Sequence, residues 1–247
     1  MAVAVVMKIR LDKYLADMGL GARSQVKKEI RDGGVTVNGA VTRRPETKID
    51  TEQDEIAFHG EPVAYTEYEY YMLNKPAGVV SASSDRQETT VIDLIGERKR
   101  NGLFPIGRLD KDTEGLLIIT NNGELAHRLL SPKKHVDKVY FARIKGYVTE
   151  TDVENFSRGV DIGDEKPTLP AELFICRSDD ISEIRLTIRE GRFHQVKRMF
   201  RAVGKEVVYL KRLRMGDVSL DDGLMPGEYR RLTEEEVERL CSQEKKL

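Results

Sequence analysis

The 247-residue chain has no tryptophan, only two cysteines and only four histidines. Cys176 and Cys241 lie 65 positions apart with no Cys-x-x-Cys spacing, and the histidines are scattered along the chain. The sequence therefore contains neither the ligand pattern of a zinc site nor a disulfide framework, and we expect no metal. Two isolated cysteines are typical of a reducing interior, so we expect a cytoplasmic protein.

Long hydrophobic runs are also missing. The apolar start of the chain, residues 1–6, is too short for a signal peptide or a membrane span, and we expect no membrane partner. Hydrophobic residues still make up 39% of the sequence, which is compatible with well-packed cores and argues against disorder. The length fits one large domain or two smaller ones.

The chain lacks an excess of either charge, because 41 basic residues face 42 acidic ones for a net charge of −1. There is thus no overall attraction to nucleic acid. The distribution is uneven, however. Residues 8–48 hold ten Lys and Arg against five acids, and residues 189–214 hold nine against two, whereas residues 217–247 hold nine acids against five bases. This pattern predicts two basic faces and an acidic C-terminal segment.

The first basic region is predicted to form two short helices and a hairpin. Leu11 and Leu15 begin an apolar helical stripe, and Ser24 is the expected N-cap of a second helix that ends at Gly33. Asn38-Gly39 is a strong signal for a two-residue hairpin turn, because both residues tolerate positive φ. A basic helix alone is usually only a solvated face.

The most informative stretch is residues 107–123. Asp110 lies in a loop rich in charged residues, immediately before an apolar run over residues 116–120 that predicts a buried strand closed by an Asn122-Gly123 turn. A carboxylate at such a strand entrance can face a cleft, although a solvated turn is the plain alternative. The spacing of acids imitates the start of an EF-hand loop, but Asn121 occupies the twelfth position and cannot supply the bidentate carboxylate, so calcium is not expected.

The second basic region predicts a strand and a helix. Residues 184–188 alternate apolar and polar side chains, and residues 194–203 carry apolar side chains at helical spacing before Gly204. Lys197 lies off the apolar stripe, where it could face a cleft or solvent. Further strands are expected at residues 68–73, 79–80, 138–142 and 206–215, and further helices at residues 124–130 and 234–240.

Several of these stretches resemble the RNA pseudouridine synthases, in particular the RsuA-like branch that modifies ribosomal RNA. Residues 107–123 resemble the central family motif, with Asn122 where Asp is usual, and residues 74–78, 138–140 and 190–200 resemble the other motifs. Residues 10–15, 22–30 and 33–39 resemble the S4 RNA-binding module. The resemblance spans roughly residues 8–240. It implies an α+β fold with an S4 domain at residues 7–58, a linker at 59–66 and a catalytic domain at 67–247, built on a mixed, mostly antiparallel sheet flanked by helices.

The resemblance also implies roles for individual residues. Asp110 would be the catalytic carboxylate, Lys197 its basic partner, and Tyr140 the ring that stacks on the target uracil. Arg108 would fill the space left by a flipped-out base. No cofactor is expected, since the reaction is a redox-neutral isomerisation. The residues expected to contact RNA are Arg10, Arg23, Ser24, Lys27, Lys28, Arg31, Asn38, Arg192, His194, Gln195 and Arg198.

The expected partner is ribosomal RNA, free or in an assembling particle, and we expect a monomer. Small-subunit RNA is the favoured substrate and large-subunit RNA the alternative. Two other classes of function stay open. The chain could be a non-catalytic RNA-binding or ribosome-assembly factor, or a hydrolase that uses Asp110 and Asp112 as an acid–base pair. The flanking Arg108 and Lys111 disfavour the hydrolase, because no apolar surroundings are evident that would raise the pKa of one carboxyl group.

Overall fold

The computed structural model describes residues 8–131 and 134–242, so the expectation for residues 1–6 lies outside the described residues. The chain divides into two compact units. The first comprises the N-terminal residues up to Glu69 together with Glu97–Leu103, and the second comprises Tyr70–Gly96 together with the chain from Phe104 onward. Among the described helices, none combines the length and the apolar character needed to cross a bilayer.

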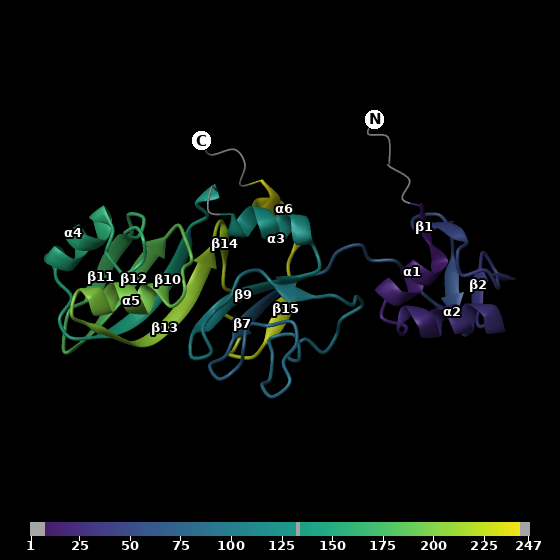
Figure 1. The fold of residues 1–247 in the computed structure, drawn as a ribbon, viewed down its shortest axis with the longest axis horizontal. Helices are drawn as coiled ribbons and strands as arrows, with labels where there is room; N and C mark the ends of the chain where they lie inside the picture. Colours follow the sequence, from purple (N-terminus) through teal and green to yellow (C-terminus); the bar gives the residue numbers. More distant parts are fainter. Residues whose placement is uncertain (1–7, 132–133, 243–247) are drawn as a thin grey trace. The chain divides into compact units, whose positions relative to one another are not determined.

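The first unit contains the predicted helices and hairpin (Figure 1). Its helices are α1 (Leu11–Asp17) and α2 (Arg23–Asp32). The Asn38-Gly39 turn joins β2 and β3 as expected, with Asn38 at φ 51°. The Ser24 prediction was wrong: the N-cap of α2 is Ala22, whose backbone N–H donates to the side chain of Gln25 at 3.0 Å. The strands are β1 (Lys8–Arg10), β2 (Val35–Val37), β3 (Ala40–Val41), β4 (Lys48–Asp50), β5 (Ile56–Phe58) and β6 (Glu61–Pro62).

Residues 59–66, which we expected to form a linker, take part in the first unit. β6 pairs with β5 in the four-stranded sheet β3-β2-β5-β6. The ring of Tyr65 stacks on that of Tyr14 at a centroid distance of 5.1 Å, and the Tyr14 hydroxyl donates to the carbonyl of Val63. Aromatic packing of this kind holds the segment against the core. The polar composition of residues 59–66 gave no sign of it.

The second unit is built on a mixed, mostly antiparallel sheet, as predicted. Its main path runs β11-β12-β10-β13-β9-β7-β15, and among these neighbours only β13 and β9 are parallel. The strands are β7 (Tyr70–Lys75), β8 (Phe104–Pro105), β9 (Glu114–Thr120), β10 (Lys138–Lys145), β11 (Glu172–Arg177), β12 (Ile181–Ile188), β13 (Glu206–Met215), β14 (Val218–Ser219) and β15 (Tyr229–Arg231).

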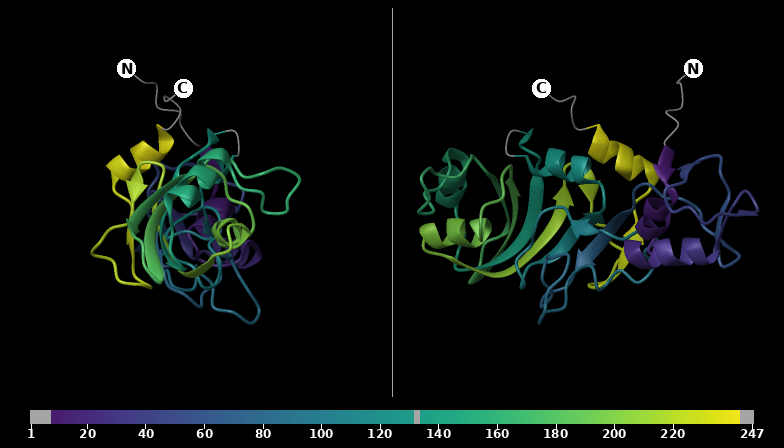
Figure 2. Two further views of the ribbon diagram at one scale, coloured as in Figure 1. Left: turned by 90° about the vertical axis from the view of Figure 1, so that its left-hand side faces the viewer. Right: turned by 45° about the vertical axis from the view of Figure 1, so that its right-hand side comes forward.

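Helices cover the sheet of the second unit in two places. α3 (Gly123–Leu130) and α6 (Glu234–Cys241) pack side by side, and their apolar faces join a core with Met72 and Ile118 (Figures 1 and 2). α4 (Glu150–Arg158) packs on β11 and α5 (Gln195–Ala202) on β13, and Phe156 and Phe200 from these two helices meet at a centroid distance of 4.9 Å.

Two local predictions for this unit need correction. Asn122-Gly123 does not form a turn that merely closes β9. Asn122 is the N-cap of α3, and its side chain accepts a hydrogen bond from the backbone N–H of Leu125 at 3.0 Å. Residues 79–80 form no regular strand, only an isolated bridge between Val80 and Thr90. The helix predicted at residues 124–130 follows directly as α3, and the sequence analysis missed only the capping role of Asn122.

Candidate functional site

The loop between β8 and β9 carries Asp110. Lys75, at the end of β7, holds this loop through hydrogen bonds to its backbone. Lys75 is completely buried, and its Nζ donates to the carbonyl oxygens of Pro76 at 2.9 Å, Thr113 at 2.9 Å and Lys111 at 3.3 Å. Burial lowers the pKa of the Lys75 ammonium to about 8, against the opposing pull of the nearby carboxylates. The three carbonyls satisfy a buried cation, so the loop backbone and Lys75 fix one another.

A second anchor holds the loop on the other side of Asp110. The hydroxyl of Ser81 donates to the carbonyl of Leu109 at 2.8 Å and accepts from the Leu109 N–H at 3.1 Å. The N–H of Gly78 donates to the carbonyl of Lys111 at 2.7 Å. The backbone on both sides of Asp110 is therefore tied to the 78–81 segment, which fixes the position from which the Asp110 side chain extends.

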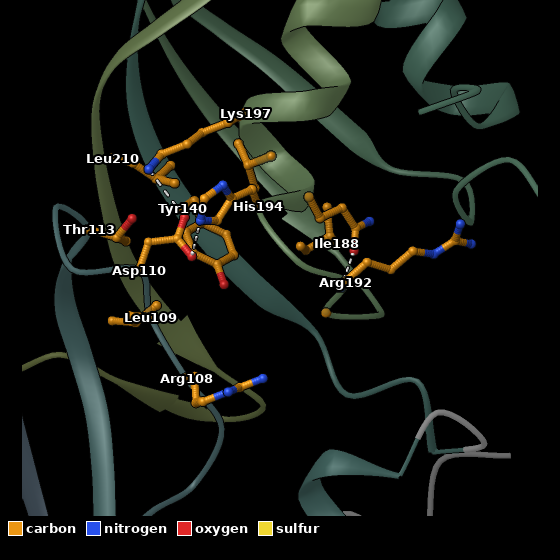
Figure 3. Close-up of a pocket in the computed structure, with 13 residues that line it drawn as sticks. Arg108, Leu109, Asp110, Thr113, Tyr140, Ile188, Arg192, His194, Lys197 and Leu210 are labelled. Atoms are coloured by element: carbon orange, nitrogen blue, oxygen red, sulfur yellow. Dashed lines mark hydrogen bonds and ion pairs between the residues drawn. The ribbon is translucent and has the colours of Figure 1, made fainter. Parts of the chain in front are cut away.

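The Asp110 carboxylate faces two basic side chains from the start of α5. Lys197 Nζ lies 3.2 Å from Asp110 Oδ2, and His194 Nε2 lies 3.6 Å from Asp110 Oδ1 (Figure 3). Lys197 also donates to Asp112 Oδ1 at 2.6 Å, so it bridges two carboxylates of the loop. The Asp110 side chain is 25% exposed, which leaves it reachable from the pocket.

Electrostatics keep the bridging lysine charged. Burial on its own would lower the pKa of Lys197, but the hydrogen bonds to Asp112 and Asp110 outweigh it and raise that pKa above its usual value. The same hydrogen bond from Lys197 lowers the pKa of the Asp112 carboxyl group. At neutral pH Lys197 is therefore an ammonium that bridges the side chains of Asp110 and Asp112.

The pocket beside Asp110 gathers the residues that the family resemblance singled out. Tyr140 comes from β10, where it pairs with Leu186, and it is only 7% exposed; its ring lies beside the Asp110 carboxylate (Figure 3). Arg108 is exposed at the pocket edge, and its side chain has no ion pair or hydrogen bond within the described part of the chain. The pocket lining includes Arg108, Asp110, Tyr140, Arg192, His194, Gln195 and Lys197.

Three of the residues expected to contact RNA near α5 are engaged inside the protein. Gln195 is 4% exposed, and its amide donates to Glu190 Oε1 at 2.9 Å. Arg198 donates to the carbonyl of Ile162 at 2.6 Å and to Asp164. Arg192 binds the same Asp164 and donates to the carbonyl oxygens at positions 166 and 167. In this structure Arg192 and Arg198 brace the 162–167 segment.

The basic face of the first unit is likewise partly used for structure. Asp12 is completely buried, and Arg10, Arg23 and Lys27 lie 2.9, 3.2 and 3.8 Å from its carboxylate oxygens. Burial would raise the pKa of Asp12, but the hydrogen bonds from Arg10 and Arg23 lower it to about 2. Lys28 on α2 is exposed.

The remaining expected RNA contacts of the first unit differ in their engagement. Ser24 and Arg31 are exposed on α2. Asn38 is also exposed, but its side chain bonds Asp54 Oδ1 at 2.8 Å and accepts from the Glu55 N–H at 2.9 Å, which stabilises the hairpin.

Sequence reasoning assigned no site role to Lys75, Ser81 or the Asp112–Lys197 contact. Lys75 and Ser81 are far from Asp110 in sequence. The pairing of β7 with β9 brings the 75–81 segment next to the loop, and no local signal predicted that contact. Asp112 was weighed only as a calcium ligand and as half of a hydrolase pair. Its position two residues after Asp110 was a usable signal, because both carboxylates can then reach one cation.

Comparison with known proteins is consistent with this geometry. The family model for RNA pseudouridylate synthase matches residues 69–202, and the S4 domain model matches residues 9–56. The chain belongs to the RNA pseudouridylate synthase family. The first match contains Asp110, Tyr140 and Lys197, and the second contains the cations around Asp12. The chain is therefore a pseudouridine synthase with an N-terminal S4 RNA-binding domain, as the motifs predicted.

Relatives of this synthase match over nearly their whole length. The RNA pseudouridine synthase YtzG of Bacillus subtilis (strain 168) is 50% identical over 234 residues, which cover 94% of this chain and 98% of the relative. Ribosomal small subunit pseudouridine synthase A of Escherichia coli (strain K12) is 42% identical over 231 residues, with coverage of 93% and 98%. A pseudouridylate synthase crystal structure matches with a TM-score of 0.66 and 42% identity, covering 94% of this chain and 99% of that one.

Proposed function

We propose that this synthase converts one uridine of small-subunit ribosomal RNA into pseudouridine, with Asp110 as the catalytic carboxylate. The observation that carries the proposal is the partly exposed Asp110 carboxylate, held beside the Tyr140 ring and 3.2 Å from the Lys197 ammonium. The small-subunit substrate is supported by the name of the Escherichia coli relative, which is 42% identical. A cytoplasmic location follows for an enzyme that acts on ribosomal RNA.

The reaction breaks the N1–C1′ bond of a uridine, turns the uracil and rejoins it through C5. The target base must leave its stack to reach a recessed carboxylate, at a cost of a few kcal/mol that is smallest for an unpaired base. The exposed Arg108 side chain at the pocket edge is free to take the vacated place. Tyr140, buried except for its pocket edge, offers the flipped uracil a flat apolar surface.

Asp110 then acts at the sugar, as a nucleophile or by assisting departure of the uracil. A nucleotide that closes the pocket removes water from the carboxylate, which disfavours its charged form. The Lys197 ammonium offsets this desolvation and orients the carboxylate. Because Lys75 and Ser81 fix the loop from two sides, this orientation exists before RNA binds, and little reorganisation is needed at the moment of reaction.

The test pairs Asp110→Asn with the matched control Asp112→Asn, which removes the same charge from the same loop. Asp110→Asn should lower the rate of isomerisation by about 10⁴-fold or more while RNA affinity is kept, since a group of this kind acts in the reaction itself. Asp112→Asn should stay within about tenfold of the original rate, because Lys197 still contacts Asp110. Pseudouridine formation by an Asp110→Asn protein would contradict the assignment.

The substrate is tested separately, by mass-spectrometric mapping of pseudouridine in ribosomal RNA from cells with and without the gene. We expect a single site to disappear from the small-subunit RNA. A site lost from the large-subunit RNA instead would overturn the substrate but keep the reaction. No lost site at all would favour a non-catalytic RNA-binding role.

A further inference from the structure

A second groove shares Lys197 with the Asp110 pocket but is not lined by Asp110, and it has no assigned role. It is lined by the end of β10, the last turns of α5 and the turn that leads into β13. Lys197 and Asp112 lie in its wall, so the groove begins at the cluster that holds Asp110. Its lining consists of Asp112, Lys145, Gly146, Lys197, Arg201, Gly204, Lys205, Glu206 and Val207.

Four cations and two carboxylates line this groove, and two of the cations are uncommitted. Lys197 and Lys205 are engaged, the latter with the buried Asp152 at 2.8 Å. Lys145 and Arg201 are exposed, and neither side chain has an ion pair or hydrogen bond to any residue that the structure describes. Such cations in a concave surface raise the local concentration of anions, because the walls focus their field.

The walls also leave room for a chain to approach. Gly146 and Gly204 have positive φ, and a Cβ built on either would meet no atom within 4 Å. The groove therefore has low, glycine-lined edges next to exposed cations, a form that admits a backbone phosphate better than a buried base. No aromatic side chain lines it, so it offers no stacking surface for a base.

From these observations we infer that the groove is a phosphate-binding subsite, in which Lys145 and Arg201 contact the phosphodiester next to the nucleotide that enters the Asp110 pocket. The inference rests on the proposed function, because the RNA that fills the pocket must continue beyond Lys197. The contact supplies affinity and register but reads no base. Glu206, the cross-strand neighbour of Lys145, opposes it and limits the affinity.

The test measures steady-state kinetics of Lys145→Gln and Arg201→Gln on a small-subunit RNA fragment. Each substitution should raise KM by about tenfold and leave kcat within about twofold, since it removes binding that is equal in ground and transition states. Glu206→Gln should lower KM by a few-fold, because it removes repulsion from the same phosphate. The matched control is Arg158→Gln, a 74%-exposed arginine on α4 that does not line the groove, which should leave both constants unchanged.

A second readout separates phosphate contact from a general effect on the fold. In the Asp110→Asn background, RNA affinity is measured at several salt concentrations. Loss of one phosphate contact should reduce the slope of log affinity against log salt by about 0.7 for an unpaired strand. Unchanged KM and unchanged slope in an active enzyme would overturn the subsite, as would a fall in kcat at constant KM. An inactive original protein would instead overturn the proposed function.

Discussion

Asp12 in the first unit and Asp110 in the second are both contacted by basic side chains, yet they differ in access to solvent. Asp12 is completely buried and is contacted by three basic side chains, whereas the Asp110 side chain is 25% exposed and is contacted by one lysine and one histidine. The first arrangement ties α2 to the start of α1. The second leaves a carboxylate reachable from a pocket. A carboxylate with basic partners therefore stabilises the fold where it is buried, as at Asp12. It can take part in a reaction where a substrate can reach it, as at Asp110.

The largest expected effect tests the exposed member of this comparison. Lys197→Met removes the ammonium beside Asp110 and should lower kcat by about 10²- to 10³-fold, the usual loss when one preorganised electrostatic group is removed. The free energy of unfolding should change little, because the carboxylates that Lys197 contacts in the described structure, Asp110 and Asp112, are both accessible to solvent. Single-turnover kinetics measure the expected loss of rate, and a thermal melt checks that stability is kept. A kcat within fivefold of the original would show that Lys197 does not support the reaction.

Asp12→Asn probes the buried member and should have the opposite signature. Replacing the buried carboxylate should cost about 2 kcal/mol of unfolding free energy, less than the loss typical of a fully buried pair, because Arg10 and Arg23 can regain water. The kcat of the folded enzyme should not change. Denaturant unfolding gives the first quantity and saturating-substrate kinetics the second.

Acid provides an independent check on Asp12. Its folded-state pKa, about 2, lies below the ordinary value of about 3.9, so its stabilisation is present above pH 4 and is lost as pH falls toward 2. In the Asp12→Asn protein this part of the acid-induced loss of stability should be missing. An identical pH profile in both proteins would show that Asp12 gains nothing from its partners.

A smaller effect on activity is expected when the pH is raised above neutral. Lys75 should lose its proton near pH 8, which removes one donor from three carbonyl oxygens and loosens the Asp110 loop, so activity should decline above pH 8. The unfolded state keeps that proton to about pH 10.4, so the contribution of Lys75 to stability rises over the same interval. Activity and stability should therefore move in opposite directions.

Lys138 supplies the matched control for Lys75. Burial lowers the pKa of Lys138 to about 8 as well, but among the described residues its Nζ donates to one carbonyl, that of Val136, and to no part of the Asp110 loop. The alkaline decline in activity should be absent in Lys75→Met and retained in Lys138→Met. Retention of the decline in both variants would assign it to another group.

The comparison of the two carboxylates also shows what the sequence could and could not predict. Asp110, Tyr140 and Lys197 lie in motifs with fixed spacing, and the structure brings these residues together. Asp12 and its three cations are also close in sequence, but the pattern of a basic helix is the same whether the charges face water or a buried acid. Burial is a property of the whole fold. The sequence therefore showed that Arg10, Arg23 and Lys27 are basic, but not that they contact a buried aspartate.

The fold, too, could be predicted from the sequence only in part. Periodicity and turn signals predicted most elements, since apolar alternation is a local property, whereas the mixed sheet was implied by the family resemblance. The edge strand β11 was missed, and its burial pattern explains why: Phe174 and Cys176 are exposed although they are apolar. Arg192 and Arg198 were expected to face RNA, but they pair with the 162–167 segment, which no local signal links to α5.

The place of β15 in the sheet has a consequence for a shortened chain. β7, whose last residue is Lys75, pairs with β9 on one side and with β15 on the other, and β15 is the last strand of the described chain. Without Tyr229–Arg231, this side of β7 would be an unpaired edge. We therefore expect a chain cut before Tyr229–Arg231 to expose the backbone edge of the strand that carries Lys75.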